Sequence, residues 1–261
     1  MEKRIIARGL LAGAIGGVLA FVFARVFVEP VIDRAIAYED GVGELHDHGA
    51  HEHGVELFTR GVQANIGMGF GVLAFSVAMG ALFAVAYCVS YGRVGDISPR
   101  LLSVLLAGGM LLSLYVIPAL KYPPNPPAVS LDETIRQRTL LYLLMVVLSA
   151  ALIVAAVWLG RRLAPRFGGF SATLIAAGSY VVAVAVVMLV LPTIDETPGP
   201  VRDDAGTIIY PAFPADDLYE FRLYSLGTQL VLWATIGLVF APMAARLLGD
   251  RESRRVASIS A

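Results

Sequence analysis

Six long apolar stretches set the strongest limit on how this chain of 261 residues folds. Each has 20 residues or more, and together they make up about half of the chain. About 20 helical residues are needed to cross a hydrocarbon core of about 30 Å. Arg25 is the only charged side chain within them, whereas helices of soluble proteins keep a polar stripe. The stretches occupy residues 9–28, 66–91, 101–120, 140–160, 171–191 and 223–245.

The pattern predicts an all-α integral membrane protein, a bundle of about six transmembrane helices in one membrane domain. Strands are excluded because the stretches are too long for them and show no alternation of apolar and polar residues. Apolar residues make up 57% of the chain and charged residues 16%, against about a quarter charged in soluble domains. The net charge of −1 indicates no nucleic-acid partner, and the single cysteine, Cys88, excludes an internal disulfide.

Charged residues alternate from one connecting segment to the next. The N-terminus, the second and fourth loops and the tail 246–261 together carry a net charge of +8, whereas the other three loops carry −10. Because basic residues stay on the cytoplasmic side, we expect both termini and the basic tail in the cytoplasm and three long acidic loops outside.

The first apolar stretch has two interpretations. Its basic start and the small residue Ala24 are compatible with a signal peptide that is cleaved. Its length and the four-residue spacing of Gly9, Gly13 and Gly17 instead favour a retained helix that another helix approaches closely. We expect the helix to be retained.

The first outer loop contains every histidine of the chain within eight residues. Imidazole nitrogens suit divalent transition metals, and neighbouring carboxylates can complete the coordination shell. Glycines in and around the run predict a flexible His-rich loop over residues 41–56. The pattern favours a metal-capture loop over a merely solvated one, but it does not single out cobalt, nickel or zinc. The candidate ligands are His46, Asp47, His48, His51, Glu52 and His53.

Other polar residues lie at the expected outer ends of the helices. Arg25 and Glu29 are four residues apart, so we expect an ion pair on one helix face, with Pro30 ending the helix. The second outer loop has four prolines between residues 123 and 127, which predicts either a rigid cap over a pathway or a simple connector. In the cap, Lys121 and Arg138 would pair with acids of other loops.

The third outer loop, residues 192–222, is rich in acids. Asp195 and Glu196 directly follow the fifth stretch, so they are candidates for a pathway mouth, and we expect the other acids to be solvated. Within the membrane the stretches contain no Asp, Glu, His or Lys, and the chain has no phosphate-binding loop. The sequence therefore indicates no energy-coupling device, no organic cofactor and no enzyme activity.

Several segments of the chain match motifs of one known family. Besides the His-rich run, they are Arg8–Gly13, Phe27–Pro30, Ile32–Ile36, Arg60–Gln63, Leu120–Val129, Leu191 and Pro192 with Glu196, Phe221–Leu223 and Ser225–Gln229. The most specific are the Lys-Tyr-Pro-rich stretch and the stretch Phe221–Gln229. Together these segments resemble the CbtA family, the larger subunit of a predicted prokaryotic cobalt transporter, and the resemblance spans nearly the whole chain except the basic tail. It implies a place in the cytoplasmic (inner) membrane of a prokaryote.

The resemblance implies cobalt as substrate and a small, single-span, His-bearing companion subunit. The resemblance does not decide whether the protein forms a homo-oligomer, and it assigns no catalytic residue. We therefore expect a component for uptake of a divalent transition-metal ion, with the His-rich loop as its outer capture site. The candidates for an outer mouth or for ion pairs are Arg25, Glu29, Arg60, Lys121, Asn125, Arg138, Asp195, Glu196 and Arg222.

Two other classes of function remain open at this point. A membrane-bound metal sensor or assembly scaffold would bind metal without conducting it. An intramembrane enzyme acting on lipid is less favoured, because no stretch carries a nucleophile paired with a base.

Overall fold

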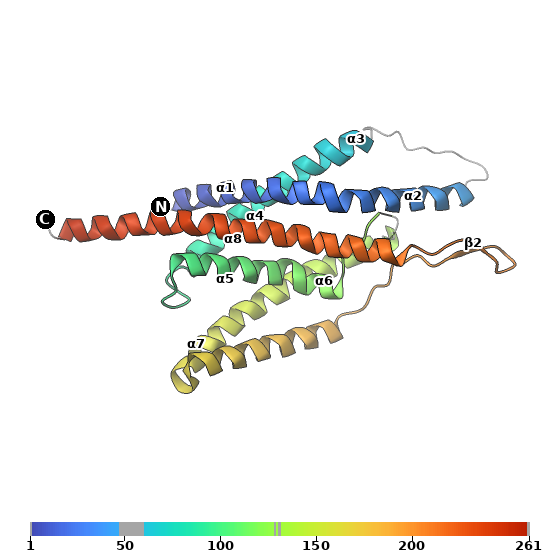
Figure 1. The fold of residues 1–261 in the computed structure, drawn as a ribbon. Coiled ribbons are helices and arrows are strands. Elements are labelled where there is room, and N and C mark those ends of the chain that lie inside the picture. The colour runs from blue at the N-terminus through green and yellow to red at the C-terminus, as the bar shows by residue number, and fades with distance from the viewer. Residues whose placement is uncertain (1, 47–59, 128, 130–131, 260–261) are drawn as a thin grey trace.

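A computed structural model describes residues 2–46, 60–127, 129 and 132–259 of the chain. In this part most residues are helical, and five helices are long and apolar enough to cross a membrane. The expectation of an all-α membrane protein is thereby confirmed at the level of class. Figure 1 shows long helices running side by side, with a small β-hairpin beyond one end of the bundle.

The first long helix combines α1 (Glu2–Phe23), a π-helical turn η1 (Ala24–Val28) and α2 (Glu29–His46). The expectation that Pro30 ends the helix is wrong, because α2 continues through it. Proline lacks an amide hydrogen, and the preceding π-turn already changes the bonding pattern, with the Glu29 amide donating to the Ala24 carbonyl. The 18 residues of α2 extend about 27 Å at about 1.5 Å per residue.

Two further long helices contain π-turns. One consists of α3 (Arg60–Val62), η2 (Gln63–Gly67) and α4 (Met68–Ser90). The other consists of α5 (Pro99–Leu111), η3 (Leu112–Val116) and α6 (Ile117–Lys121). Ser98 caps the start of α5, where its hydroxyl oxygen accepts a hydrogen bond from the Leu101 amide at 3.3 Å.

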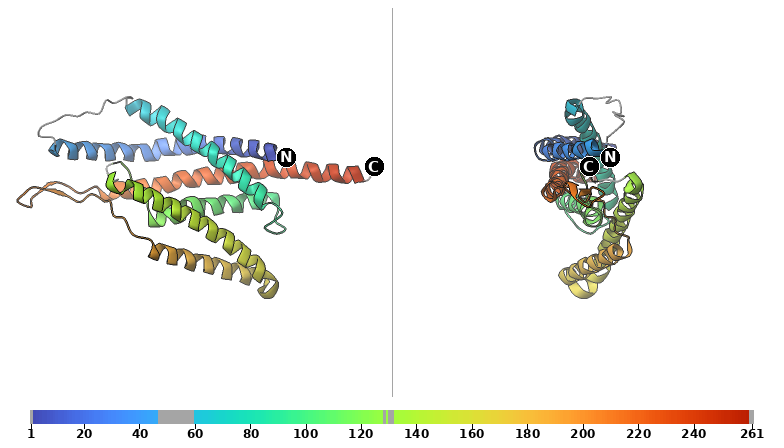
Figure 2. Two further views of the ribbon diagram at one scale, coloured as in Figure 1. Left: turned by 180° about the vertical axis from the view of Figure 1, so that it is seen from behind. Right: turned by 90° about the vertical axis from the view of Figure 1, so that its right-hand side faces the viewer.

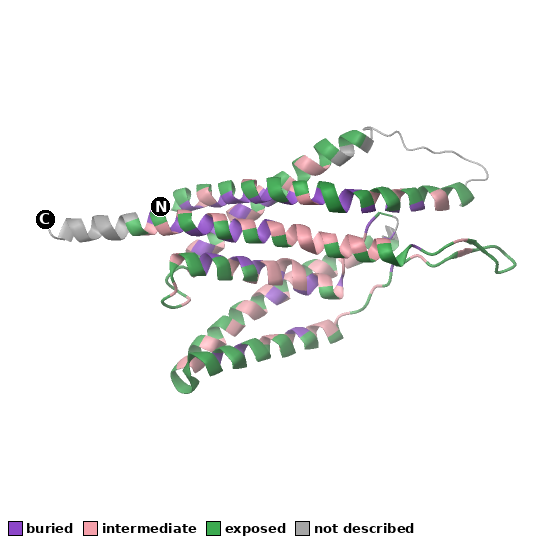
Figure 3. Cartoon of the chain, viewed as in Figure 1, coloured by how far each residue is buried: buried purple, intermediate pink, exposed green. Residues whose placement is uncertain are grey.

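Helix α7 (Asp132–Val190) is bent into two arms at Gly168. Gly168 has φ 77° and ψ 159°, a conformation that residues with a Cβ rarely adopt. The expected stretches 140–160 and 171–191 lie in the two arms. The fourth connection is thus a tight turn between helices. Figure 3 shows that α7 is largely exposed along its length.

The third outer loop is more ordered than expected. Strands β1 (Val201–Arg202) and β2 (Ile208–Tyr210) pair in antiparallel fashion, and the turn between them contains Gly206 with φ 83°. Helix α8 (Ala215–Ile259) begins eight residues before the expected stretch 223–245 and continues into the basic tail. The Asp216 and Asp217 carboxylates in its first turn complement the helix dipole.

The main core lies among α1, α4, α5 and α8, and α7 packs at the side of this group (Figures 1 and 2). A Cβ atom added at Gly9 or Gly13 would overlap the backbone of α4 at Gly80 or Ser76. The glycine repeat therefore allows the close helix approach that its spacing predicts. Helices α5 and α8 also meet closely, since a Cβ at Gly237 would lie 2.7 Å from that of Ala107.

Candidate functional site

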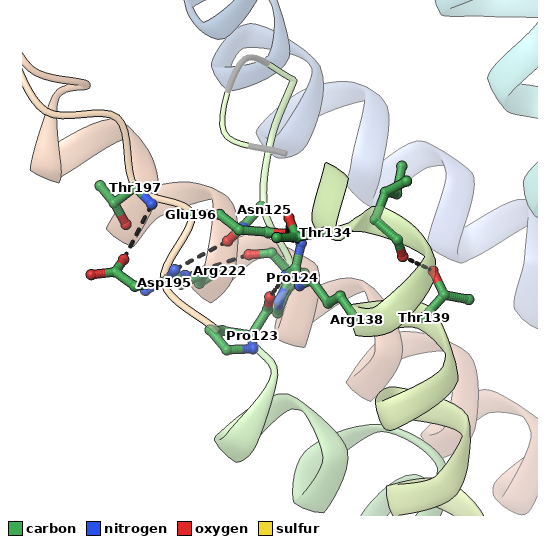
Figure 4. Close-up of polar contacts among 11 residues, drawn as sticks. Pro123, Pro124, Asn125, Thr134, Arg138, Thr139, Asp195, Glu196, Thr197 and Arg222 are labelled. Carbon is green, nitrogen blue, oxygen red and sulfur yellow. Dashed lines mark hydrogen bonds and ion pairs between the residues drawn. The ribbon is translucent and has the colours of Figure 1, made fainter. Parts of the chain in front are cut away.

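A buried carboxylate lies where the proline-rich segment, α7 and the segment after α7 meet (Figure 4). The Glu196 side chain is 1% exposed, and its Oε2 atom is 2.8 Å from Nη1 of Arg138. Asn125 donates to the same oxygen at 3.0 Å, and Thr134 donates to Oε1 at 2.5 Å. A buried charge with one ionic partner and two further donors is well compensated.

The proline-rich segment explains why two arginines are needed here. Its prolines have no amide hydrogens, so the segment offers carbonyl oxygens without the matching donors. Arg138 donates to the Pro123 carbonyl, and Arg222 donates to the Pro124 carbonyl at 3.4 Å and to Asn125 Oδ1 at 3.1 Å. We refer to Asn125, Thr134, Arg138, Glu196 and Arg222 as the Glu196 cluster.

Tyr122 fastens the same segment to the end of α7. Its hydroxyl donates to the Pro192 carbonyl at 2.8 Å, and its ring is buried. Burial raises the pKa of the Tyr122 phenol, so the group stays protonated and remains a donor at neutral pH. The second and third outer segments are therefore held together by several side chains.

The Glu196 cluster is suited to holding chain segments together rather than to binding an ion. Its two guanidinium groups outnumber its single carboxylate, and Arg138, Asn125 and Thr134 already engage both carboxylate oxygens. A metal cation would have to displace Arg138 in order to reach Glu196. The ion pair of Arg138 with an acid of another segment agrees with the expected cap, whereas a role of these residues at a pathway mouth stays a prediction.

Arg25 has a different contact from the one expected for it. Its Nε atom donates to Asn65 Oδ1 at 3.0 Å, and Asn65 in turn donates to the Gly61 carbonyl at 2.8 Å. Arg25 lies in the π-turn η1, where bonding from residue i to i+5 changes the alignment of residues four apart. Glu29 is 2% exposed and has contacts of its own. The π-turns η1 and η2 are thus joined by the Arg25–Asn65 hydrogen bond.

Helix α2 is held against the hairpin and the start of α8. Arg34 forms ion pairs with Asp217 at 2.5 Å and with Glu220. Tyr38 packs its ring edge-to-face against Phe213, and its hydroxyl donates to the Pro211 carbonyl at 3.0 Å. The expectation that the acids of the third loop other than Asp195 and Glu196 are all solvated is therefore wrong for Asp217 and Glu220.

The candidate metal ligands are placed only in part. His46 is the last residue of α2, and Asp47, His48, His51, Glu52 and His53 lie outside the described residues. Within the described residues, no group of three or more His, Cys, Asp or Glu side chains is arranged to hold a metal. The His-rich metal site therefore stays a prediction.

The remaining candidates lie apart from one another. Arg60 begins α3, and Lys121 ends α6. Asp195 accepts a hydrogen bond from the Thr197 amide at 3.2 Å, which is a local turn contact. Sequence reasoning missed Thr134 and Arg34. No local motif marks Thr134. The excess of acidic over basic residues in the first outer loop could have directed attention to Arg34.

The fold defines a multi-pass helical membrane protein. The family whose model matches residues 2–245 is described as "probable cobalt transporter subunit (CbtA)". The match covers nearly the whole chain, so the chain belongs to the CbtA family of transporter subunits. No curated protein and no solved structure matches it.

Proposed function

We propose that the chain takes up a divalent transition-metal ion, cobalt in the first place, from outside the cytoplasmic membrane of a prokaryote. The observation that carries this proposal is the His-rich run, which follows α2 in the sequence. Helix α2 extends about 27 Å beyond its start at Glu29, at about 1.5 Å per residue. Membership of a cobalt transporter family supports the choice of metal, and nickel or zinc would suit the same ligands.

In this proposal α2 serves as a stalk for the capture loop. Its contacts through Arg34 and Tyr38 hold it against α8 and the hairpin, so the His-rich run starts from a fixed base. Acidic residues on the stalk and the third outer segment would raise the local concentration of cations. A companion subunit, single-span and His-bearing by the family resemblance, would complete the transporter.

Replacing the four histidines with alanine should lower the rate of cobalt uptake at least about 10-fold at limiting metal, because each lost imidazole weakens capture. Uptake of radioactive cobalt by cells that carry the variant in place of the native chain measures this. At saturating cobalt the difference should shrink, since capture then no longer limits uptake. Alanine at Asp203 and Asp204 is the control for a general loss of outer charge. Equal uptake by the His variant at limiting metal would remove the loop from the mechanism.

The proposed topology has six crossings, both termini in the cytoplasm and the His-rich run outside. A cysteine introduced at Gly49, in a chain with Cys88 replaced by alanine, should react with a membrane-impermeant maleimide in intact cells. A cysteine introduced at Gly169, in the turn of α7, should react only after the cells are opened. Labelling of the two sites in the reverse order would contradict the uptake scheme.

A membrane-bound metal sensor or scaffold is the second candidate. The closed state of the Glu196 cluster favours it, because both carboxylate oxygens there are already engaged. Reconstitution into vesicles, with and without the companion subunit, separates the two functions. Cobalt binding without flux in both preparations would support the sensor and contradict uptake.

A further inference from the structure

Three arginines lie near the bend of α7 without an acidic partner. Arg161, Arg162 and Arg166 are exposed, and they fall within about two helical turns before Gly168. No Asp or Glu occurs anywhere in residues 134–194, so nothing along this part of the chain offsets their charge. Within the described residues, none of the three takes part in a hydrogen bond or an ion pair. Their charge is therefore available to a partner outside the protein.

Exposed aromatic rings flank these arginines. Trp158 is 58% exposed, and the Arg162 guanidinium lies over its ring, with Cζ 5.2 Å from the ring centroid. Trp158, Arg162 and Arg166 are spaced four residues apart, so they lie in one row on the helix surface. Phe167 and Phe170 are also exposed, at 53% and 78%. Aromatic rings beside basic side chains are typical of segments at the surface of a bilayer. We refer to this group as the α7 tip, which consists of Trp158, Arg161, Arg162, Arg166, Phe167 and Phe170.

The position of the α7 tip in the chain places it at a membrane surface. The apolar stretches on its two sides, residues 140–160 and 171–191, are each long enough to cross the hydrocarbon core. The turn between two such stretches lies at one face of that core. Figures 1 and 2 show the bend of α7 standing away from the other helices, at the same end of the bundle as both termini. The tip can therefore reach the lipid headgroups at that face.

We propose that the α7 tip binds the headgroups of anionic phospholipids. The three guanidinium groups donate hydrogen bonds to phosphate oxygens, which arginine engages in a bidentate manner. The aromatic rings lie between the headgroups and the upper acyl chains. An acidic protein segment would match the charge alone, but the exposed rings and the two membrane-crossing arms favour lipid as the occupant. The inference goes beyond the proposed uptake function and does not depend on it, because it concerns the membrane and not the metal.

The two tryptophans of the chain allow a direct test. Trp158 belongs to the α7 tip, whereas Trp233 is buried in the core, so Trp233→Phe leaves one fluorophore, at the proposed site. The full chain with this change is reconstituted into vesicles of equal parts phosphatidylglycerol and phosphatidylcholine. One of the two lipids carries brominated acyl chains, which quench the fluorescence of a neighbouring tryptophan. The quenching should show that phosphatidylglycerol is preferred at Trp158 by at least about 3-fold, because basic residues at the surface attract anionic lipid.

Three sets of substitutions separate the α7 tip from the overall charge of the protein. Arg161→Gln, Arg162→Gln and Arg166→Gln, made together, should abolish the preference for phosphatidylglycerol. Arg161→Lys, Arg162→Lys and Arg166→Lys keep the charge but lose the bidentate geometry, so they should keep part of the preference. Arg93→Gln with Arg100→Gln removes exposed charge from another loop and should leave the preference within about 1.5-fold, because distant surface charges are screened.

Every other outcome contradicts the inference. Equal quenching by the two brominated lipids, before any arginine is changed, would show that the α7 tip selects no anionic lipid. An unchanged preference in the glutamine variant, or an equal loss in the Arg93 and Arg100 control, would assign the preference to the charge of the whole surface. A glutamine variant that does not fold would show that these arginines have partners within the protein. None of these results bears on cobalt uptake, since the measurement uses no metal.

Discussion

Replacing Gly80 with leucine is expected to abolish the close packing of α1 on α4. A Cβ atom at Gly80 would already overlap the backbone of α1 at Gly9, and it would lie 2.8 Å from the Gly13 Cα atom. Backbone atoms of two packed helices cannot move aside as a flexible side chain can. We therefore expect a loss of stability at or above the upper end of the usual range for overpacking, about 1–3 kcal/mol.

The measurement is the unfolding midpoint of the purified protein in detergent, with the yield from membranes beside it. A loss of about 3 kcal/mol corresponds to a fall of roughly 10 °C for a chain of this size. Gly71→Leu is the control, because Gly71 lies on the same helix and a Cβ there meets nothing within 4 Å. Equal midpoints for the two variants would show that α1 and α4 are not closely packed at Gly80.

Removal of the Arg138 guanidinium is expected to destabilise the outer end of the protein strongly. Glu196 is 1% exposed on its side chain, so Arg138→Ala leaves a buried carboxylate with only neutral donors. Breaking a buried ion pair in this way destabilises by about 3–5 kcal/mol, because the remaining charge has no compensation. The unfolding midpoint should fall accordingly.

Two further variants test the cause of that effect. Arg138→Ala combined with Glu196→Gln should recover part of the lost stability, since no unpaired charge then stays buried. Arg136→Ala changes an exposed arginine two residues away on the same helix and should leave the midpoint within about 0.5 kcal/mol of the wild type. A double variant no more stable than Arg138→Ala alone would contradict the assigned ion pair.

The helical membrane class and the places of the apolar helices could be read from the chain itself. Length and hydropathy are local quantities, and a helix that crosses lipid satisfies its backbone hydrogen bonds within itself. The glycine repeat that begins at Gly9 likewise indicated a close helix contact. Its partner residues on α4, Ser76 and Gly80, could not be identified, because the pairing of helices depends on the shapes of both surfaces.

Errors arose where the chain departs from regular helix geometry. The expected Arg25–Glu29 pair assumed α-helical spacing, whereas Arg25 lies within the π-turn η1 and donates to Asn65. The expected end of the first helix at Pro30 failed for the same reason. No composition rule marks a π-turn, and contacts such as the Arg25–Asn65 hydrogen bond form only in the folded bundle.

The candidate site, too, could be predicted from the sequence only in part. The sequence alone offered a rigid cap, in which Arg138 pairs with an acid of another loop, beside a simple connector, and it placed Glu196 at the end of a membrane stretch. It did not show that the two meet, with Asn125 and Thr134 completing the shell of the carboxylate. The His-rich run, by contrast, is recognised by composition alone, since its candidate ligands are all close in the chain.

The sequence by itself determined that the helices of this protein lie in lipid, and it determined the family to which the chain belongs. Both conclusions depend only on the order of residues along the chain. Only the tertiary structure decided which polar groups meet: Glu196 with Arg138, and Arg25 with Asn65. These partners are separated by 58 and 40 positions in the chain. The physical reason is that a hydrogen bond or an ion pair needs contact within about 3–4 Å, and contacts between distant segments are fixed by how whole helices pack.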